Sequence, residues 1–224
     1  MRISHLFILL AASAMLTACD FLDEYNPNSV TVGNYYTSEE DIVASLNGVY
    51  TSLTQSYVAD NYHYFTDVRA NATVVTNSGA NSGIPYQFYN YTLTEENVYV
   101  YNRYSQLYKI ISRANTLFAH LGDVSYATPS ARDTYEAEAR FLRALSYYWL
   151  VTEWGDVPLV LKVLESTEEV RANNYRRPKA EIYQAIFDDL KYVTESPLLD
   201  VQPASACGKV SKAAAWALWG KALL

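Results

Sequence analysis

The stretch EARFLRALSYYWLVTEWGDVPLV, residues 138 to 160, carries the clearest periodic pattern in the sequence. Within and just before it, apolar and small residues recur three or four positions apart, at Ala137, Phe141, Ala144, Leu145 and Tyr148. That period is typical of an amphipathic helix. Thr128-Pro129 supplies a start signal and Gly155 a stop signal. We therefore predict a helix over residues 128–154.

The opposite side of this helix is predicted to be polar. It carries Glu136, Arg140, Arg143 and Tyr147. Glu136 precedes Arg140 by four residues, the orientation that favours an ion pair along a helix. We interpret the two arginines as structural, with anion binding as the alternative. Asp156, which follows Gly155, is expected to hold the turn into the next segment.

Four more helices are predicted around this one. The first spans about 38–55 with Thr37 and Glu40 as a capping box, the second 98–121, the next runs from Pro178 to Glu195, and Ser211 caps the last. The last helix reads KAAAWALWGKALL, and it is apolar on nearly all sides. We therefore expect it to be buried between neighbours.

Amphipathic helices joined by turns predict an all-α fold of tetratricopeptide-like helical hairpins, although no strict repeat period is visible. A long irregular loop of about forty residues, 57–96, interrupts the helices and contains a β-like piece at 73–76. Long ordered loops often carry function. Because the apolar last helix has no capping element, we expect the domain that begins at residue 37 to be truncated at residue 224 and to continue in a longer protein.

The first residues resemble an export signal. Arg2 precedes an apolar stretch, Leu6–Leu16, that is too short to span a bilayer. The sequence Leu-Thr-Ala-Cys that ends at Cys19 resembles a bacterial lipobox, so we predict a signal peptide over 1–18 and a lipid anchor with its tether over 19–36. Simple secretion with a chance cysteine is the alternative. With Cys19 lipidated, Cys207 would have no disulfide partner.

Composition excludes several classes of function. The net charge is −7, and the longest basic run is Arg176-Arg177, so a nucleic-acid surface is not expected. The chain has only two cysteines and three histidines, too few for a zinc site or a cysteine–histidine nucleophile. No hydrolase or phosphate-loop motif is present. We predict no catalytic residue, no metal site and no cofactor.

The residue 138–160 motif resembles the signature of the SusD/RagB family of outer-membrane nutrient-binding lipoproteins. Four further pieces agree with that family in order, namely the lipobox with Cys19–Asp23, Arg113-Ala114-Asn115, Arg177-Pro178 with Ile186 and Asp189-Leu190, and Gly208-Lys209-Val210. The resemblance implies an α-helical fold with tetratricopeptide-like hairpins and a missing C-terminal half. It also implies an outer-membrane lipoprotein facing the cell exterior, which delivers oligosaccharides, or peptides in some members, to a TonB-dependent (SusC-like) transporter.

Tyrosine is unusually abundant, at 21 of 224 residues. A sugar site stacks aromatic rings on C–H faces and places amide or charged groups at the edge. In the family, part of the ligand contact comes from the long loop and the helix after it. The candidates there are Arg69, Tyr86, Tyr89, Tyr91, Tyr99, Tyr101 and Asn102, beside Arg103.

Each candidate has a structural alternative. The helical spacing of Tyr101, Tyr104 and Tyr108 favours packing over ligand contact, and for Arg69 we expect a loop-stabilising ion pair with Asp67 rather than ligand contact. Our leading hypothesis is a glycan-capturing lipoprotein. The alternatives are a peptide-capturing member of the same family, a lipid-anchored scaffold that binds other proteins, and a glycosidase, for which 24 acidic residues leave room.

Overall fold

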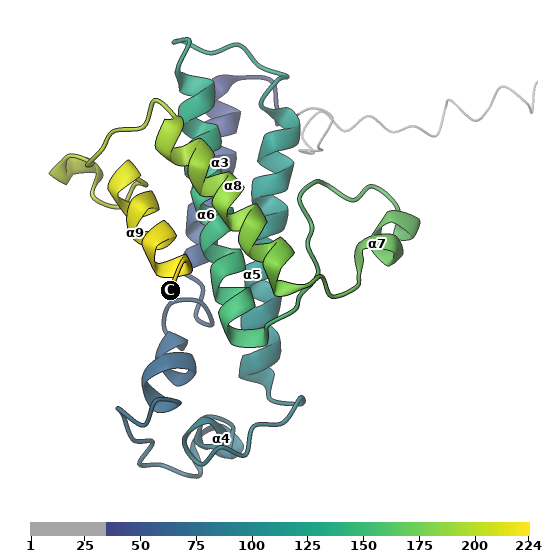
Figure 1. Ribbon diagram of the computed structural model, residues 1–224, viewed down its shortest axis with the longest axis vertical. Coiled ribbons are helices and arrows are strands. Elements are labelled where there is room, and N and C mark those ends of the chain that lie inside the picture. Colours follow the sequence, from purple (N-terminus) through teal and green to yellow (C-terminus); the bar gives the residue numbers. More distant parts are fainter. Residues whose placement is uncertain (1–34) are drawn as a thin grey trace, which may run out of the picture. The chain divides into compact units, whose positions relative to one another are not determined.

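Five long helices dominate the computed structural model, which describes residues 35–224 except the side chains of residues 80 and 81. They are α3 (Glu39–Leu53), α5 (Val98–His120), α6 (Ala131–Trp154), α8 (Lys179–Glu195) and α9 (Lys212–Ala222) (Figure 1). Among the described residues the only β-pairing is an isolated bridge between Val157 and Arg177. The predicted all-α fold is confirmed. The predicted signal peptide, Cys19 and most of the tether lie outside the described residues.

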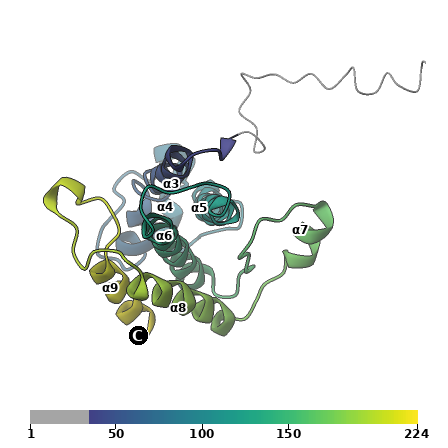
Figure 2. The ribbon, with the colours of Figure 1, turned by 90° about the horizontal axis from the view of Figure 1, so that it is seen from above.

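The helices pack on their neighbours in the chain. Helix α5 contacts α3 and α6, α6 contacts α8, and α8 contacts α9 (Figure 2). One core joins them, and its fully buried members include Leu46, Leu107, Leu142, Ile186 and Leu190. Burying each such side chain contributes about 1.5–3 kcal/mol. The helical hairpins predicted from the sequence are therefore present.

The N-terminus of α3 is capped by a different pair from the predicted one. The helix begins at Glu39, so Ser38 is the N-cap and Asp41 occupies the third position. The Ser38 hydroxyl accepts from the Asp41 N–H, and Asp41 Oδ2 accepts from the Thr37 and Ser38 N–H groups, each at 3.0 Å. The Thr37 and Glu40 assignment was wrong by one residue, because both registers match the capping pattern.

We expect Asp41→Asn to destabilise the protein at neutral pH and to remove part of its acid sensitivity. Hydrogen bonds from Thr37 and Ser38 hold the pKa of Asp41 below its usual value. A lowered pKa gives stability that is present above about pH 4, the unfolded value, and is lost as pH falls through the folded value. Urea unfolding from pH 3 to 7 measures this. Glu40→Gln is the matched control, and an equal effect of both variants would contradict the assignment.

Helix α6 begins later than predicted and ends where predicted. It starts at Ala131, and Ser130, not Thr128, is the N-cap, without a side-chain hydrogen bond. At its other end Gly155 has a φ of 75°, a conformation that glycine adopts readily. Asp156 was expected to hold this turn, but its carboxylate accepts a hydrogen bond from the Lys179 N–H and so links the end of α6 to the start of α8.

The predicted polar face of α6 is buried. Glu136, Arg143 and Tyr147 lie against α8 and the segment after α6, and each is at most 7% exposed. Arg143 makes two hydrogen bonds to the carboxylate of Asp189 on α8, and Arg140 bonds both Glu136 and Asp189. The structural interpretation of the arginines is therefore confirmed. The polar groups are buried because they satisfy one another.

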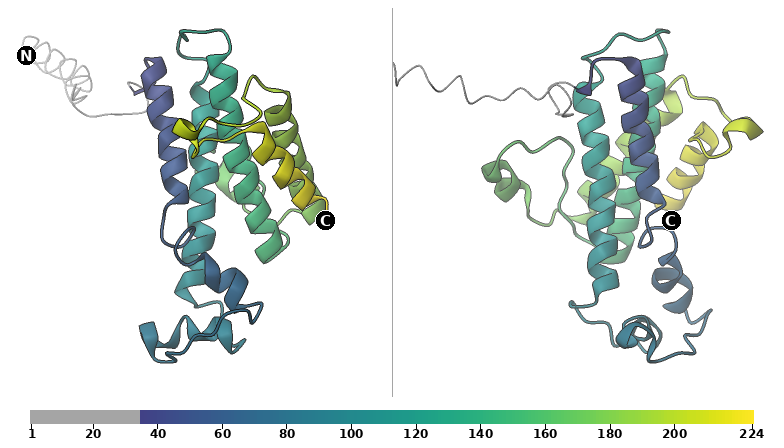
Figure 3. Two further views of the ribbon diagram at one scale, coloured as in Figure 1. Left: turned by 90° about the vertical axis from the view of Figure 1, so that its left-hand side faces the viewer. Right: turned by 180° about the vertical axis from the view of Figure 1, so that it is seen from behind.

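The segment between α3 and α5 lies at one end of the bundle (Figure 3). It contains more regular secondary structure than the irregular loop that we predicted. It contains a π-helix η2 (Tyr64–Val68), a 3-10 helix η3 (Ala80–Gly83) and α4 (Tyr86–Tyr89). Residues 73–76 form no strand, so the β-like interpretation was wrong. Phe65, Val68, Phe88 and Tyr99 form a separate small core there.

Two further short helices, outside the segment between α3 and α5, were also missed by the sequence pattern. They are α7 (Thr167–Asn173) and the 3-10 helix η4 (Ala204–Ala206). Helix α7 buries no side chain and stands away from the main helices (Figure 2). Its Ser166 cap and an ion pair between Lys162 and Glu169 hold it in place. A helix without an apolar stripe gives no periodic signal.

Helix α9 is less covered than predicted. Ser211 caps it as expected, but only Ala215 and Leu218 are buried, and Trp216 is 59% exposed. Phe187, Trp219 and Trp216 stack in sequence across α8 and α9. The expectation that all sides of α9 would be buried is therefore wrong.

None of the helices in residues 35–224 is long and apolar enough to cross a membrane. Cys207 is an exposed free thiol.

Candidate functional site

The residues that form the candidate site come together at the end of the bundle where α5 begins and α6 ends (Figure 3). Asn97 positions this end. Its side-chain oxygen accepts from the Tyr99 and Val100 N–H groups and so caps α5, while its amide donates to Ile84 O and to Gln87 Oε1. One residue thus anchors α5 to the segment around α4.

A first hollow of about 180 Å³ opens beside Tyr101 and Tyr104 of α5. Tyr101 is 68% exposed, and Tyr104 packs edge-on against Trp154 with their ring centroids 5.3 Å apart. The remaining lining residues are Glu95, Val100, Asp156, Val157 and Arg176. Aromatic rings therefore form one wall, and both signs of charge stand around them.

A second hollow of about 200 Å³ adjoins the first through Val100 and Trp154. Its other lining residues are Phe65, Arg69, Phe88, Leu93, Thr94 and Glu153. The Phe65 and Trp154 ring centroids are 6.3 Å apart. We call the two hollows together the aromatic site.

A buried ion pair lies beneath the aromatic site. Arg103 is fully buried and donates two hydrogen bonds to Glu153, at 2.7 and 2.6 Å. Its guanidinium also donates to Tyr57 O and Val58 O and lies over the rings of three aromatic residues, Tyr62, Phe65 and Trp149. Burial raises the pKa of Glu153 above its usual value, although the bonds from Arg103 act in the opposite direction. Arg103 thus joins α5 and α6 to the residues after α3.

The structure places the predicted ligand residues in four different settings. Arg69 and Tyr101 line the aromatic site. Tyr99 belongs to the small core and is 8% exposed, whereas Asn102 and the mutually packed Tyr86 and Tyr89 are half-buried outside the two hollows. Tyr91 is exposed, and its hydroxyl donates to Arg69 O.

The structural alternatives also separate. Tyr104 and Tyr108 pack against the main core as the helical spacing indicated, but Tyr101 does not pack there. Among the described residues no ion pair joins Arg69 to Asp67. Burial raises the pKa of Glu153, and the positive charge of Arg69 instead partly opposes that increase. The prediction of that ion pair was wrong.

Sequence reasoning missed most residues of the aromatic site, and the aromatic and charged ones missed in the first hollow are Glu95, Trp154, Asp156 and Arg176. The sequence did indicate that Trp154 could be a site residue. An aromatic residue directly before a helix-ending glycine has no following helical turn whose side chains would cover its ring. The other three gave no such indication, since a charged residue in a loop is usually solvated.

The chemistry of the aromatic site suits a neutral polar ligand with apolar faces. Outside the Arg103–Glu153 pair, two arginines and two carboxylates surround the rings, so the charges balance. Such a mixture can hydrogen-bond hydroxyl groups as donor and acceptor. Within residues 35–224 no cluster of three or more metal-ligating side chains occurs.

Comparison with known sequences identifies related proteins. The model of a SusD-like family, described as starch-binding and associating with the outer membrane, matches residues 20–224. SusD-like protein P2 of Formosa agariphila is 27% identical over 216 residues, 96% of this chain and 41% of that protein. A SusD-like protein of Bacteroides ovatus is 25% identical over 207 residues, 86% of this chain and 35% of that protein. The chain thus spans about two fifths of the length of these relatives.

Solved structures share the fold. A laminarin-binding SusD-like protein has a TM-score of 0.72 at 27% identity, over 84% of this chain and 40% of that one. Surface glycan-binding protein A from Bacteroides thetaiotaomicron, in complex with laminarihexaose, has a TM-score of 0.68 at 20% identity, over 83% and 38% of the two chains. Because the family model covers nearly the whole sequence and these folds agree, the chain belongs to the SusD/RagB family of SusD-like proteins.

Proposed function

We propose that this chain is the N-terminal part of an outer-membrane lipoprotein that binds a glycan and delivers it to a TonB-dependent transporter. The observation that carries the proposal is the aromatic site, in which the exposed ring of Tyr101 stands beside Tyr104 and Trp154. The relative that binds laminarin shares the fold at 27% identity. The lipobox that ends at Cys19 and the membership of the family support the lipid anchor, the outward-facing location and the transporter partner in this proposal.

Physical chemistry favours a sugar in this site. A pyranose ring offers a flat C–H face to an aromatic ring and hydroxyl groups around its edge, which match the charged side chains around Tyr101 and Trp154. The balanced charges favour a neutral glycan over an acidic one, because an acidic sugar would meet carboxylates as well as arginines. The site binds its ligand without chemical change in this proposal.

We expect Tyr101→Ala to weaken glycan binding about tenfold, or about 1.4 kcal/mol, because it removes an exposed stacking surface. Tyr91→Ala is the matched control. Tyr91 is 67% exposed against 68% for Tyr101, but it lines neither hollow. Affinity electrophoresis in gels containing laminarin, starch and other polysaccharides, followed by calorimetry, measures the change.

Either of two outcomes would count against the proposal. Equal losses in both variants would move the ligand out of the aromatic site toward the long loop. Absence of binding to every polysaccharide would favour the peptide-capturing alternative, or the scaffold alternative if peptides also fail. Co-purification of a TonB-dependent barrel with the full-length protein tests the delivery step separately.

A further inference from the structure

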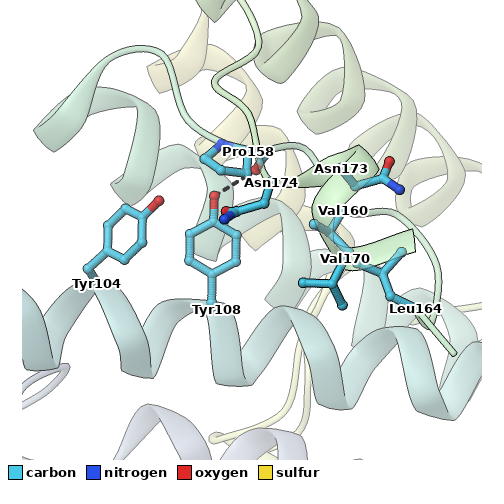
Figure 4. A pocket seen from close by; sticks show the side chains of 8 residues that line it. All are labelled: Tyr104, Tyr108, Pro158, Val160, Leu164, Val170, Asn173 and Asn174. Atoms are coloured by element: carbon cyan, nitrogen blue, oxygen red, sulfur yellow. Dashed lines mark hydrogen bonds between the residues drawn. The ribbon is translucent and has the colours of Figure 1, made fainter. Parts of the chain in front are cut away.

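A third hollow continues from the aromatic site along α5. It measures about 150 Å³ and shares Tyr104 with the first hollow. Figure 4 shows Tyr104 and Tyr108 rising side by side from α5, with Pro158 and Asn174 beyond the rings and Val160, Leu164 and Val170 at the other end. The Tyr108 hydroxyl donates to Pro158 O at 2.6 Å, which fixes the ring. Burial raises the pKa of Tyr108, so this hydroxyl stays protonated and continues to donate.

A fourth hollow of about 330 Å³ extends the same line. It shares Tyr108 and three aliphatic residues with the third hollow, and it reaches Ser112 and Asn115 further along α5. Lys162 also lines it. The amide of Asn115 already donates hydrogen bonds to Val160 O and Lys162 O, so its donors are not available to a ligand.

The four hollows together follow one face of α5. Their lining residues on this helix are Val100, Tyr101, Tyr104, Tyr108, Ile111, Ser112 and Asn115. Val100, Tyr104, Tyr108, Ile111 and Asn115 are three or four positions apart, which places them on one side of the helix, and Tyr101 and Ser112 lie at the edge of that side. From Val100 to Asn115 the helix rises about 22 Å, at 1.5 Å per residue. This is a path longer than any single sugar ring.

We propose that a linear glycan chain, bound at the aromatic site, continues along this face of α5 between the helix and α7. This inference rests on the proposed function and adds a second stretch of contact to it. Tyr104 belongs to both the first and the third hollow, so the path is continuous with the aromatic site. The ring of Tyr108 and the aliphatic wall suit the C–H faces of successive sugars, and the Asn173 and Asn174 amides suit their hydroxyl groups.

Val170→Trp tests the path without disturbing the fold. Val170 lines the third and fourth hollows, is 45% exposed, and lies on α7, which buries no side chain. A tryptophan there would fill the space beside Tyr108. Arg171→Trp is the matched control, because it places the same side chain on the next residue of α7, an exposed residue that lines none of the four hollows.

Calorimetry on the full-length protein would use laminari-oligosaccharides of increasing length and a second series cut from whichever polysaccharide binds best. We expect wild-type affinity to rise at least tenfold from the shortest oligosaccharide that binds to those that span the path. Val170→Trp should abolish this rise and leave the shortest ligand unaffected, whereas Arg171→Trp should match the wild type. Circular dichroism melting confirms that each variant is folded.

The two levels of the proposal fail differently. Binding that does not change with glycan length, or a length-dependent rise that survives in Val170→Trp, would overturn the path along α5 and leave glycan binding at the aromatic site intact. Absence of binding by glycans of every length would overturn the proposed function and this inference together, and binding of unbranched peptides by the same face would assign the path to peptides.

Discussion

Asp189→Ala should lower the free energy of unfolding by about 3–5 kcal/mol, the cost of removing one partner from a buried ion pair. Asp189 is 2% exposed, and its two carboxylate oxygens accept three hydrogen bonds, two from Arg143 and one from Arg140, at 2.7–2.8 Å. Arg143 is itself buried and cannot move to solvent when the carboxylate is lost. The guanidinium of Arg143 would then be a buried charge without a counterion between α6 and α8.

The control lies one residue away. Asp188 is exposed on the same helix, and its carboxylate accepts only a hydrogen bond from Gln184 among the contacts described. Asp188→Ala should change the free energy of unfolding by less than about 0.5 kcal/mol. Urea denaturation followed by circular dichroism measures both. A loss of less than about 1 kcal/mol for Asp189→Ala would show that Arg143 finds another partner or solvent.

Arg103→Met should have a similarly large effect and should link stability to pH. The substitution leaves Glu153 without its partner beneath the aromatic site, and we expect a loss of about 3–5 kcal/mol at neutral pH. Burial already raises the pKa of Glu153, and removing Arg103 would raise it further. A carboxyl group with a raised folded pKa favours the folded state at low pH, and this contribution is lost as pH rises through that pKa. The loss should therefore shrink as pH falls toward 5.

A double variant separates charge from packing. In Arg103→Met with Glu153→Leu no buried charge remains, so much of the lost stability should return, because apolar replacements of a buried ion pair are often neutral or stabilising. If the double variant is as unstable as Arg103→Met alone, the hydrogen bonds from Arg103 to Tyr57 O and Val58 O dominate instead. Glycan binding by the folded double variant would then show whether the ion pair also positions Trp154, which follows Glu153 directly.

Local sequence was sufficient for the helices and for most of the core. Apolar residues four positions apart in the sequence, such as Leu107 and Ile111 or Ile182 and Ile186, are buried, as expected for the core-facing stripe of an amphipathic helix. Gly155 and Ser211 stop and start helices for local reasons, glycine by its left-handed conformation and serine by its cap. The motif at residues 138–160 added the family, and with the family the arrangement of the helices in the fold.

Tertiary structure was needed wherever a polar side chain takes a partner far away in the sequence. The sequence by itself determined that α6 has an apolar and a polar side, but only Asp189, 46 residues beyond Arg143, makes the polar side a buried one. In the same way neither Tyr101 nor Trp154 indicates a binding site by itself. The two residues line one site because the start of α5 lies beside the end of α6. Burial of a charge depends on the position of its counterion, and local periodicity contains no information about that position.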